Sequence, residues 1–176
     1  MQKFDMDTVD IPTSNGGSKF RYVPNGGYVC YITKVTDNPK GEYLEIEYEI
    51  GEGEYEGFAA ETMERAGFCP LRFNRYHGEK SRGYFKKFTK DIESSNPGYK
   101  WDWNEQSLVH KYIGVVIQEQ EKVNAKGYTN VYAKVDTTCS VGDIKAGNFK
   151  VPERLKAASS VTLTEIPATD NSGLPF

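Results

Sequence analysis

The sequence predicts a mainly β fold, in which five strands form one small barrel and a helix joins the third strand to the fourth. Three observations support this fold. One segment alternates between apolar and acidic residues, four other short runs are rich in β-branched and aromatic residues, and a window with helical spacing falls between two of these runs. The length of 176 residues favours one domain with appendages.

The first two predicted strands are joined by a tight turn. Residues 28–35 (YVCYITKV) have the composition of a strand, and the Asp-Asn-Pro-Lys-Gly run at 37–41 is a strong turn signal. The next strand, 43–50 (YLEIEYEI), alternates apolar and acidic side chains: Leu44, Ile46, Tyr48 and Ile50 against Glu45, Glu47 and Glu49. This pattern predicts one face buried in the barrel and a row of carboxylates that points outward.

Two helices and a third strand are expected next. A short helix is predicted at 59–67 (AAETMERAG), ended by its glycine, and a strand at 70–77 (PLRFNRYH). From Tyr84 to Ser94 the apolar residues fall at helical spacing while lysines point elsewhere. The Asn-Pro-Gly sequence at 96–98 terminates this helix.

The last two strands are predicted at 108–121 and 130–141, joined by a glycine-containing turn. Three strands, a helix and two more strands are the order of an OB-fold, a five-stranded partly open barrel. The change to small and polar residues near Pro152 sets the domain boundaries. We expect an N-terminal arm at 1–19, an OB-fold-like domain at 20–152 and a flexible tail at 153–176.

Bulk composition excludes several classes of protein. A net charge of −3 argues against a general polycation, although a local basic groove is compatible with it. The three widely spaced cysteines form no disulfide framework and favour a reducing compartment. Apolar runs of membrane-spanning length and the pattern of a signal peptide are both missing, so we expect a cytoplasmic protein without a membrane partner.

Charge is divided between two neighbouring segments. Residues 42–64 hold nine acidic side chains and no Lys or Arg, whereas residues 72–100 hold eight basic and three acidic side chains, interleaved with aromatic residues. Proteins that bind single strands combine cations for the phosphates with aromatic rings that stack on any base, at roughly 1–3 kcal/mol per stacked base. A solvated charged face and a barrel core filled by aromatic residues explain the same segment without nucleic acid.

The candidate DNA-binding residues follow from the faces of the predicted elements. Arg72 and Tyr76 share the outward face of their strand, whereas Phe73 lies on the inward face. For Trp101 and Trp103, packing and stacking are equally expected. The predicted groove consists of Tyr31, Lys34, Arg72, Arg75, Tyr76, Lys80, Arg82, Lys86, Lys87, Trp101 and Trp103.

The acidic strand conflicts with the simplest version of this groove. OB-folds bind oligonucleotides largely on the face of strands 2 and 3, where Glu45, Glu47 and Glu49 would point out of the barrel. Either DNA crosses the other side of this strand, or the carboxylates meet basic side chains or a partner subunit.

The motifs of common catalytic sites are missing from the sequence. We find no phosphate-binding P-loop, no GxSxG, no HExxH and no CxxC, and the two histidines lack metal-ligand spacing. The carboxylates of 42–64 follow the polar face of a strand and do not indicate a convergent Mg²⁺ site. We therefore expect no enzymatic activity, no catalytic residues, no cofactor and no metal.

Four blocks of the chain resemble a known family. They are GGYVCYITKVTDNPKGEYLEIEYEIGEGEYEGF, GYFKKFTKDIESSNPGYKWDW, LVHKYIGVVIQEQE and YAKVDTTCSVGDIKAGNFKVPE. In this order they are similar to phage and prophage single-stranded-DNA-binding proteins of Gram-positive hosts, which are often labelled as being of unknown function. The resemblance spans Gly26 to Glu153. It implies an OB-fold and the binding of single-stranded DNA during phage DNA replication or recombination in the bacterial cytoplasm.

The C-terminal end resembles a second family. Bacterial single-strand-binding proteins end in an acidic stretch and a Pro-Phe tip, which recruits replication and repair proteins. Asp170, Leu174, Pro175 and Phe176 match that ending, with the departure that Asp170 is the one acidic residue near the tip. The resemblance implies phage or host replication and recombination proteins as partners, bound through the apolar side chain and the terminal carboxylate. An ordinary frayed terminus is the alternative.

These observations predict a protein that binds and protects single-stranded DNA with low sequence specificity. The alternative is an adaptor, which recruits replication proteins through its acidic hairpin and Pro-Phe tail without binding DNA. A metal-dependent nuclease is disfavoured because its site is missing. The preference for DNA over RNA stays open, as does the oligomeric state, although exposed barrel edges are compatible with a homo-oligomer.

Overall fold

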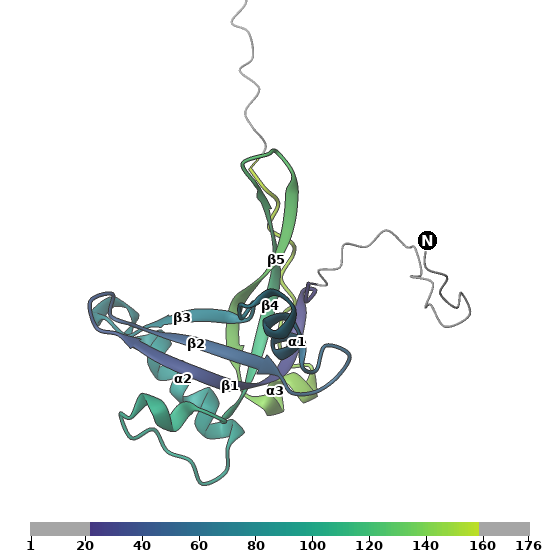
Figure 1. Cartoon of the computed structure of the whole chain (residues 1–176). Coiled ribbons are helices and arrows are strands. Elements are labelled where there is room, and N and C mark those ends of the chain that lie inside the picture. The colour runs from purple at the N-terminus through teal and green to yellow at the C-terminus, as the bar shows by residue number, and fades with distance from the viewer. Residues whose placement is uncertain (1–21, 159–176) are drawn as a thin grey trace, which may run out of the picture.

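The computed structural model describes residues 22–158, so the predicted N-terminal segment 1–19 and the tail tip lie outside the described residues. Figure 1 shows the elements in their chain order. They are β1 (Gly26–Asn38), β2 (Tyr43–Ile50), α1 (Phe58–Ala66), β3 (Arg72–Tyr76), the 3₁₀ turn η2 (Glu79–Ser81), α2 (Arg82–Ser95), the 3₁₀ turn η3 (Glu105–Leu108), β4 (Tyr112–Val123), β5 (Thr129–Cys139) and α3 (Val141–Ala146). Among these residues, no helix has the length and apolar character needed to cross a membrane.

The five strands form one antiparallel sheet in the order β3-β2-β1-β4-β5, which curls into a nearly closed barrel. Strand β1 makes this closure possible because its first half pairs with β4 and its second half pairs with β2. A bulge at Thr33, between the pairs formed by Ile32 and Lys34, bends the strand where it changes partner. With α2 between β3 and β4, the prediction of an OB-fold-like barrel is confirmed.

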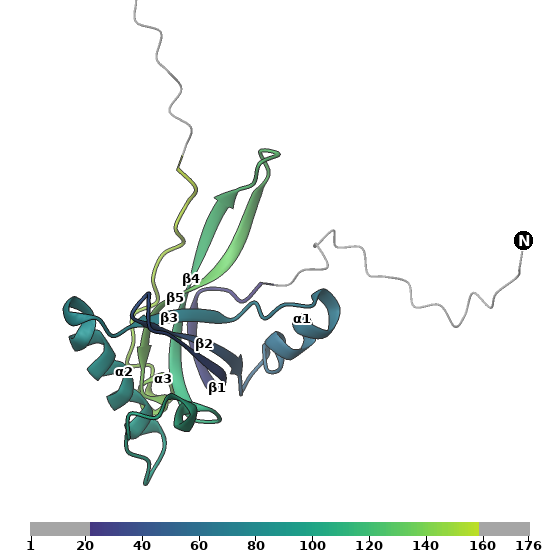
Figure 2. The same ribbon diagram turned by 60° about the vertical axis from the view of Figure 1, so that its left-hand side comes forward.

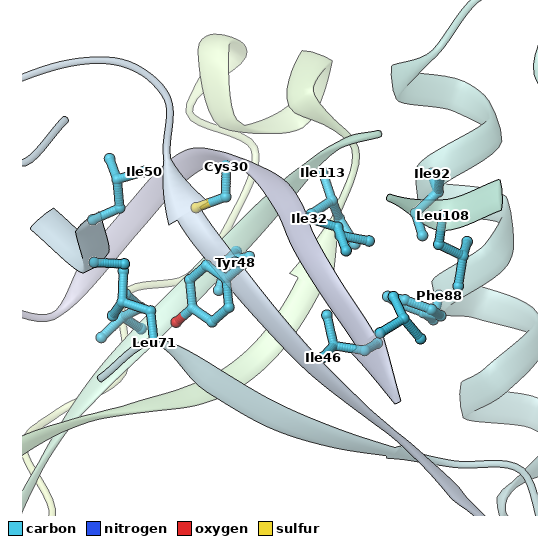
Figure 3. Packing of buried hydrophobic residues seen from close by; sticks show 14 of the residues in the cluster. Cys30, Ile32, Ile46, Tyr48, Ile50, Leu71, Phe88, Ile92, Leu108 and Ile113 are labelled. Carbon is cyan, nitrogen blue, oxygen red and sulfur yellow. The ribbon is translucent and has the colours of Figure 1, made fainter. Parts of the chain in front are cut away.

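The barrel core is built on the alternating pattern of β2. Leu44, Ile46, Tyr48 and Ile50 are all buried, as the sequence predicts. Figure 3 shows Ile46 of β2 and Ile32 of β1 on the side of Phe88 and Ile92 of α2, while Tyr48 and Ile50 lie toward Leu71 and Cys30. Burial of each large apolar side chain contributes about 1.5–3 kcal/mol to folding, so these contacts hold α2 against the barrel.

The hairpin of β4 and β5 extends well beyond the barrel (Figures 1 and 2). Strand β4 pairs with β1 only as far as Ile117. We call residues 118–134, the part of this hairpin beyond the barrel, the arm, a name that does not refer to the N-terminal segment 1–19. The last described residues follow this arm: the N–H and C=O groups of Leu155 bond to Glu119 and Glu121 of β4, each at 2.8 Å, and the Arg154 guanidinium contacts both carboxylates. Residues 153–157, which the sequence places in the tail, therefore lie against β4.

Candidate nucleic-acid interface

Strands β1, β2 and β3 present one continuous outward surface, which we call the outer face. The strand register places Lys34, Glu47 and Arg72 side by side in one row across the three strands. The parallel rows are Thr36, Glu45 and Asn74, and then Asn38, Tyr43 and Tyr76. The outer face lies on the strands that OB-folds use for oligonucleotides.

Two pairs of tyrosines lie at opposite ends of the outer face. At the end near the β1–β2 turn, the Tyr43 and Tyr76 rings have centroids 5.2 Å apart, and Tyr76 is half exposed. At the other end, Tyr31 of β1 lies 6.1 Å from Tyr112 of β4 in an edge-to-face arrangement. Each pair holds a ring in place through its partner, which preorganises an aromatic surface on which a base can stack.

The structure resolves the conflict posed by the acidic strand for Glu47 and Glu49, while Glu45 stays in the outward row between Thr36 and Asn74. Glu47 points outward and forms an ion pair of 3.4 Å with Lys34, so its charge is compensated on the outer face. Glu49 does not join the predicted outward row. It is buried, and its carboxylate accepts backbone N–H bonds from Ile50, Ala59 and Ala60 at 2.7–2.9 Å. Because the last two donors begin α1, Glu49 satisfies the positive end of that helix.

Lys80 and Arg82 lie next to the Tyr76 end of the outer face. The loop after β3 and the turn η2 carry Lys80, and Arg82 begins α2. A hollow of about 310 Å³ between this loop and the β1–β2 turn is lined by Tyr76 and Lys80, together with Glu42. Within the described residues, no carboxylate forms an ion pair with Arg72, Lys80 or Arg82. These three cations are available to phosphates.

Arg75 lies apart from Arg72 and Tyr76 because alternate residues of a strand face opposite sides. Its guanidinium carbon is 5.4 Å from the centroid of Phe73 and 5.3 Å from that of Phe88, so it packs between β3 and α2. Burial lowers the pKa of this guanidinium, and its Nε has no hydrogen-bond partner. Arg75 therefore stabilises the helix–strand contact by a cation–π interaction and does not form part of the outer face.

The two tryptophans occupy different environments. Trp101 is half-buried, with its ring 5.9 Å from that of Phe85, and its backbone N–H donates to Glu93. Trp103 is 82% exposed and has a φ of 64°, a left-handed conformation that is rare for a large side chain. Its ring lies 6.1 Å from Trp101. Trp101 supports the loop, and Trp103 is the ring of this pair that is accessible to a base.

The two lysines of α2 that were predicted to bind DNA also differ in their surroundings. Lys86 is exposed on α2. Lys87 donates to the carboxylate of Asp91 at 2.8 Å and to the backbone carbonyl of Thr138 in β5. These bonds direct Lys87 toward the end of β5, away from the outer face.

The arm carries a second set of basic and aromatic side chains, which the sequence analysis did not select. Lys122 and Tyr132 lie on its two strands, with the ammonium nitrogen 5.6 Å from the ring centroid. Tyr128 at the turn is 68% exposed, and Lys126 and Lys134 are also exposed. The signal was a turn with a lysine before it and two tyrosines and a lysine after it, but only the hairpin register brings these residues together.

Residues 22–158 contain no cluster of three or more His, Cys, Asp or Glu side chains that could hold a metal ion. No family model matches the chain, and a search of curated proteins gives no significant match. The resemblance to phage single-strand-binding proteins therefore stays a prediction, and the case for function depends on the interface itself.

Proposed function

We propose that this protein binds and protects single-stranded DNA with low sequence specificity, and that it makes and breaks no covalent bond. The observation that carries the proposal is the outer face of an OB-fold-like barrel. Two tyrosine pairs lie at its ends, and Arg72 lies between them beside the Lys34–Glu47 ion pair. Stacking on tyrosine faces does not depend on the identity of the base.

The path that this surface favours for a DNA strand runs from the β1–β2 turn to the Tyr31–Tyr112 pair. Along this path the strand would first contact Tyr76, Lys80 and Arg82. It would then contact Arg72, and finally the Tyr31–Tyr112 pair. OB-folds bind oligonucleotides with the loop between strands 1 and 2 and the loop between strands 4 and 5. Here the β1–β2 loop lies at the start of the path, whereas the β4–β5 loop lies at the other end of β4 from Tyr112.

The number of unpaired cations sets the expected salt dependence. For single strands, log K falls with log salt by about 0.7 for each phosphate that a cation neutralises. Arg72, Lys80 and Arg82 alone give a slope of about −2, which corresponds to a roughly 20-fold loss of affinity between 50 and 200 mM salt. If Lys122, Lys126 and Lys134 of the arm also bind phosphates, the slope is about −4 and the loss is roughly 300-fold.

A fluorescence titration tests the proposal. Oligo-dT is added to the full chain at 50 and at 200 mM salt while tryptophan emission is recorded, with the exposed Trp103 as the reporter. We expect saturable quenching that weakens at the higher salt, and similar affinity for oligo-dT and a mixed-sequence oligonucleotide. An absence of binding, both by this signal and by a gel shift, would refute the proposal.

The adaptor hypothesis gains some support from the loop before α1. Glu52, Glu54 and Glu56 are all exposed, and Glu52 pairs with Lys145 at 3.2 Å, so Glu54 and Glu56 are the carboxylates available to a basic partner. In that case the protein recruits phage or host replication proteins without touching DNA, and the titration shows no binding at either salt. Incubation of single strands with Mg²⁺ or Mn²⁺ addresses the nuclease alternative, for which we expect no cleavage.

We further propose, from the family resemblance, a role in phage DNA replication or recombination in the host cytoplasm. The residues that resemble a partner-binding tip, 170–176, lie outside the described residues. Their role is tested by deleting 170–176 and measuring both DNA affinity, which we expect to be unchanged, and capture of purified host replication proteins, which we expect to be lost.

A further inference from the structure

A large groove follows one edge of β5, away from the outer face. Its volume is about 930 Å³. One wall consists of five consecutive residues of β5, 129–133. Because strand side chains alternate between two faces, a wall of consecutive residues shows that the backbone edge of β5 faces the groove. The opposite wall comes from α1 and from the segment before β3, and includes Phe58, Phe68 and Leu71.

This edge of β5 lacks the features that usually protect an edge strand. β5 is the last strand in the sheet order, and among the described strands it pairs only with β4. Proteins protect such edges with charged side chains or proline, yet residues 129–133 (TNVYA) contain neither. The walls and rim of the groove expose large apolar side chains, since Tyr22, Phe68 and Tyr132 are 39–54% exposed. An uncharged edge beside apolar walls is a surface suited to a further strand.

We propose that a second copy of this chain occupies the groove, with the two β5 strands paired antiparallel about Val131. A two-fold axis requires a self-complementary patch, and residues 129–133 provide one. In this register Val131 lies opposite its own copy, Asn130 opposite Tyr132, and Thr129 opposite Ala133. The pairing supplies backbone partners for both free edges and covers the exposed aromatic rings of both grooves.

The residues on either side of this segment match the same register. Counting outward from Val131, Tyr128 just before β5 lies opposite Lys134 of the second copy, and the two-fold axis repeats this pair. Both side chains are exposed. An ammonium that faces an aromatic ring favours this register over shifted ones that place Lys134 opposite its own copy.

The proposal does not depend on DNA binding, because the groove and the outer face use different residues; the arm residues Tyr128, Tyr132 and Lys134 belong to both the pairing and the second basic set. Its first test is the mass of the full chain in solution by sedimentation equilibrium, without DNA. The chain mass is 19.8 kDa, and we expect twice this value at micromolar concentrations. Val131→Lys places two like charges on the axis and is expected to give the monomer mass. The control is Val123→Lys, which changes an exposed valine on the same hairpin that does not line the groove. It is expected to stay dimeric.

A second test does not depend on destabilising the interface. Residues at the two-fold axis lie within about 6 Å of each other, so Val131→Cys is expected to give a disulfide-linked dimer under mild oxidation. Val123→Cys and the unmodified chain, which keeps its three cysteines, measure the background. Circular dichroism verifies that each variant is folded. A monomer mass for the unmodified chain at 100 μM would overturn the proposal. So would a dimer that survives Val131→Lys, or equal cross-linking at positions 123 and 131.

Discussion

Replacement of Tyr76 by alanine is the sharpest test of the outer face. The ring is 50% exposed, and its other side is held against Tyr43 at a centroid distance of 5.2 Å. One free face can stack on one base, which contributes roughly 1–3 kcal/mol. At 1.4 kcal/mol for each factor of ten, Tyr76→Ala should weaken binding of oligo-dT by about 5- to 150-fold. Loss of the tyrosine pair costs about 0.5–1.5 kcal/mol of stability, so the domain should stay folded.

The measurement is fluorescence anisotropy with a labelled oligo-dT at 50 mM salt, and two variants serve as controls. Tyr76→Phe keeps the ring and should keep the affinity within about 3-fold, because stacking does not need the hydroxyl. Tyr22→Ala removes a ring of comparable exposure that contacts Arg154 at the base of the arm, and it should have little effect. If Tyr76→Ala binds as tightly as the unmodified chain, the outer face is not the binding surface.

Three further predictions concern the arm, the acidic strand and acid stability. Replacing Lys122, Lys126 and Lys134 with glutamine should reduce the salt slope from about −4 to about −2, and an unchanged slope would remove the arm from the interface. Glu49→Gln loses charge-assisted bonds to buried N–H groups and should lower the free energy of unfolding in urea by about 2–4 kcal/mol, whereas a loss under about 0.5 would contradict its role at α1. Hydrogen bonds from Lys90 and from the Trp101 N–H lower the pKa of Glu93 to about 2, from an ordinary value of 4.5. Its stabilising effect is therefore complete above pH 4.5 and disappears as the pH falls toward 2. Glu93→Gln should be less stable than the unmodified chain near neutral pH, and this difference should shrink over that window in thermal unfolding scans.

The strands and the main helix could be predicted from sequence because their signals are local. The alternation in 43–50 has one solution that buries its apolar residues, and Phe88 and Ile92 lie on the apolar side of α2 by their spacing alone. The order of the elements then restricted the topology to a small barrel. The extension of the β4–β5 hairpin beyond the barrel was not expected, because its length depends on where β1 stops pairing with β4.

The residues of the candidate site were predictable only where strand alternation decides which face of the sheet a side chain lies on. Arg72 and Tyr76 lie on the outward face, as expected from their spacing. The placement of Arg75 depends on the phenylalanines of two elements, and that of Trp101 depends on Phe85 of α2. Tyr112 belongs to the outer face only because β4 pairs with β1 at Tyr31. These contacts join residues that are distant in the chain, so a local pattern does not encode them.

The sequence by itself determined the barrel, its core face and a division of charge between two segments, because hydrophobic burial acts on side chains at a fixed period. The tertiary structure alone decided how that charge is used. The Glu49 carboxylate is buried and accepts N–H groups at the start of α1, and the charge of Glu47 is compensated by Lys34. Arg72 beside them forms no ion pair within the described residues. Compensation of a charge depends on the distance to its partner in space, and folding sets that distance after the local pattern has formed the strands.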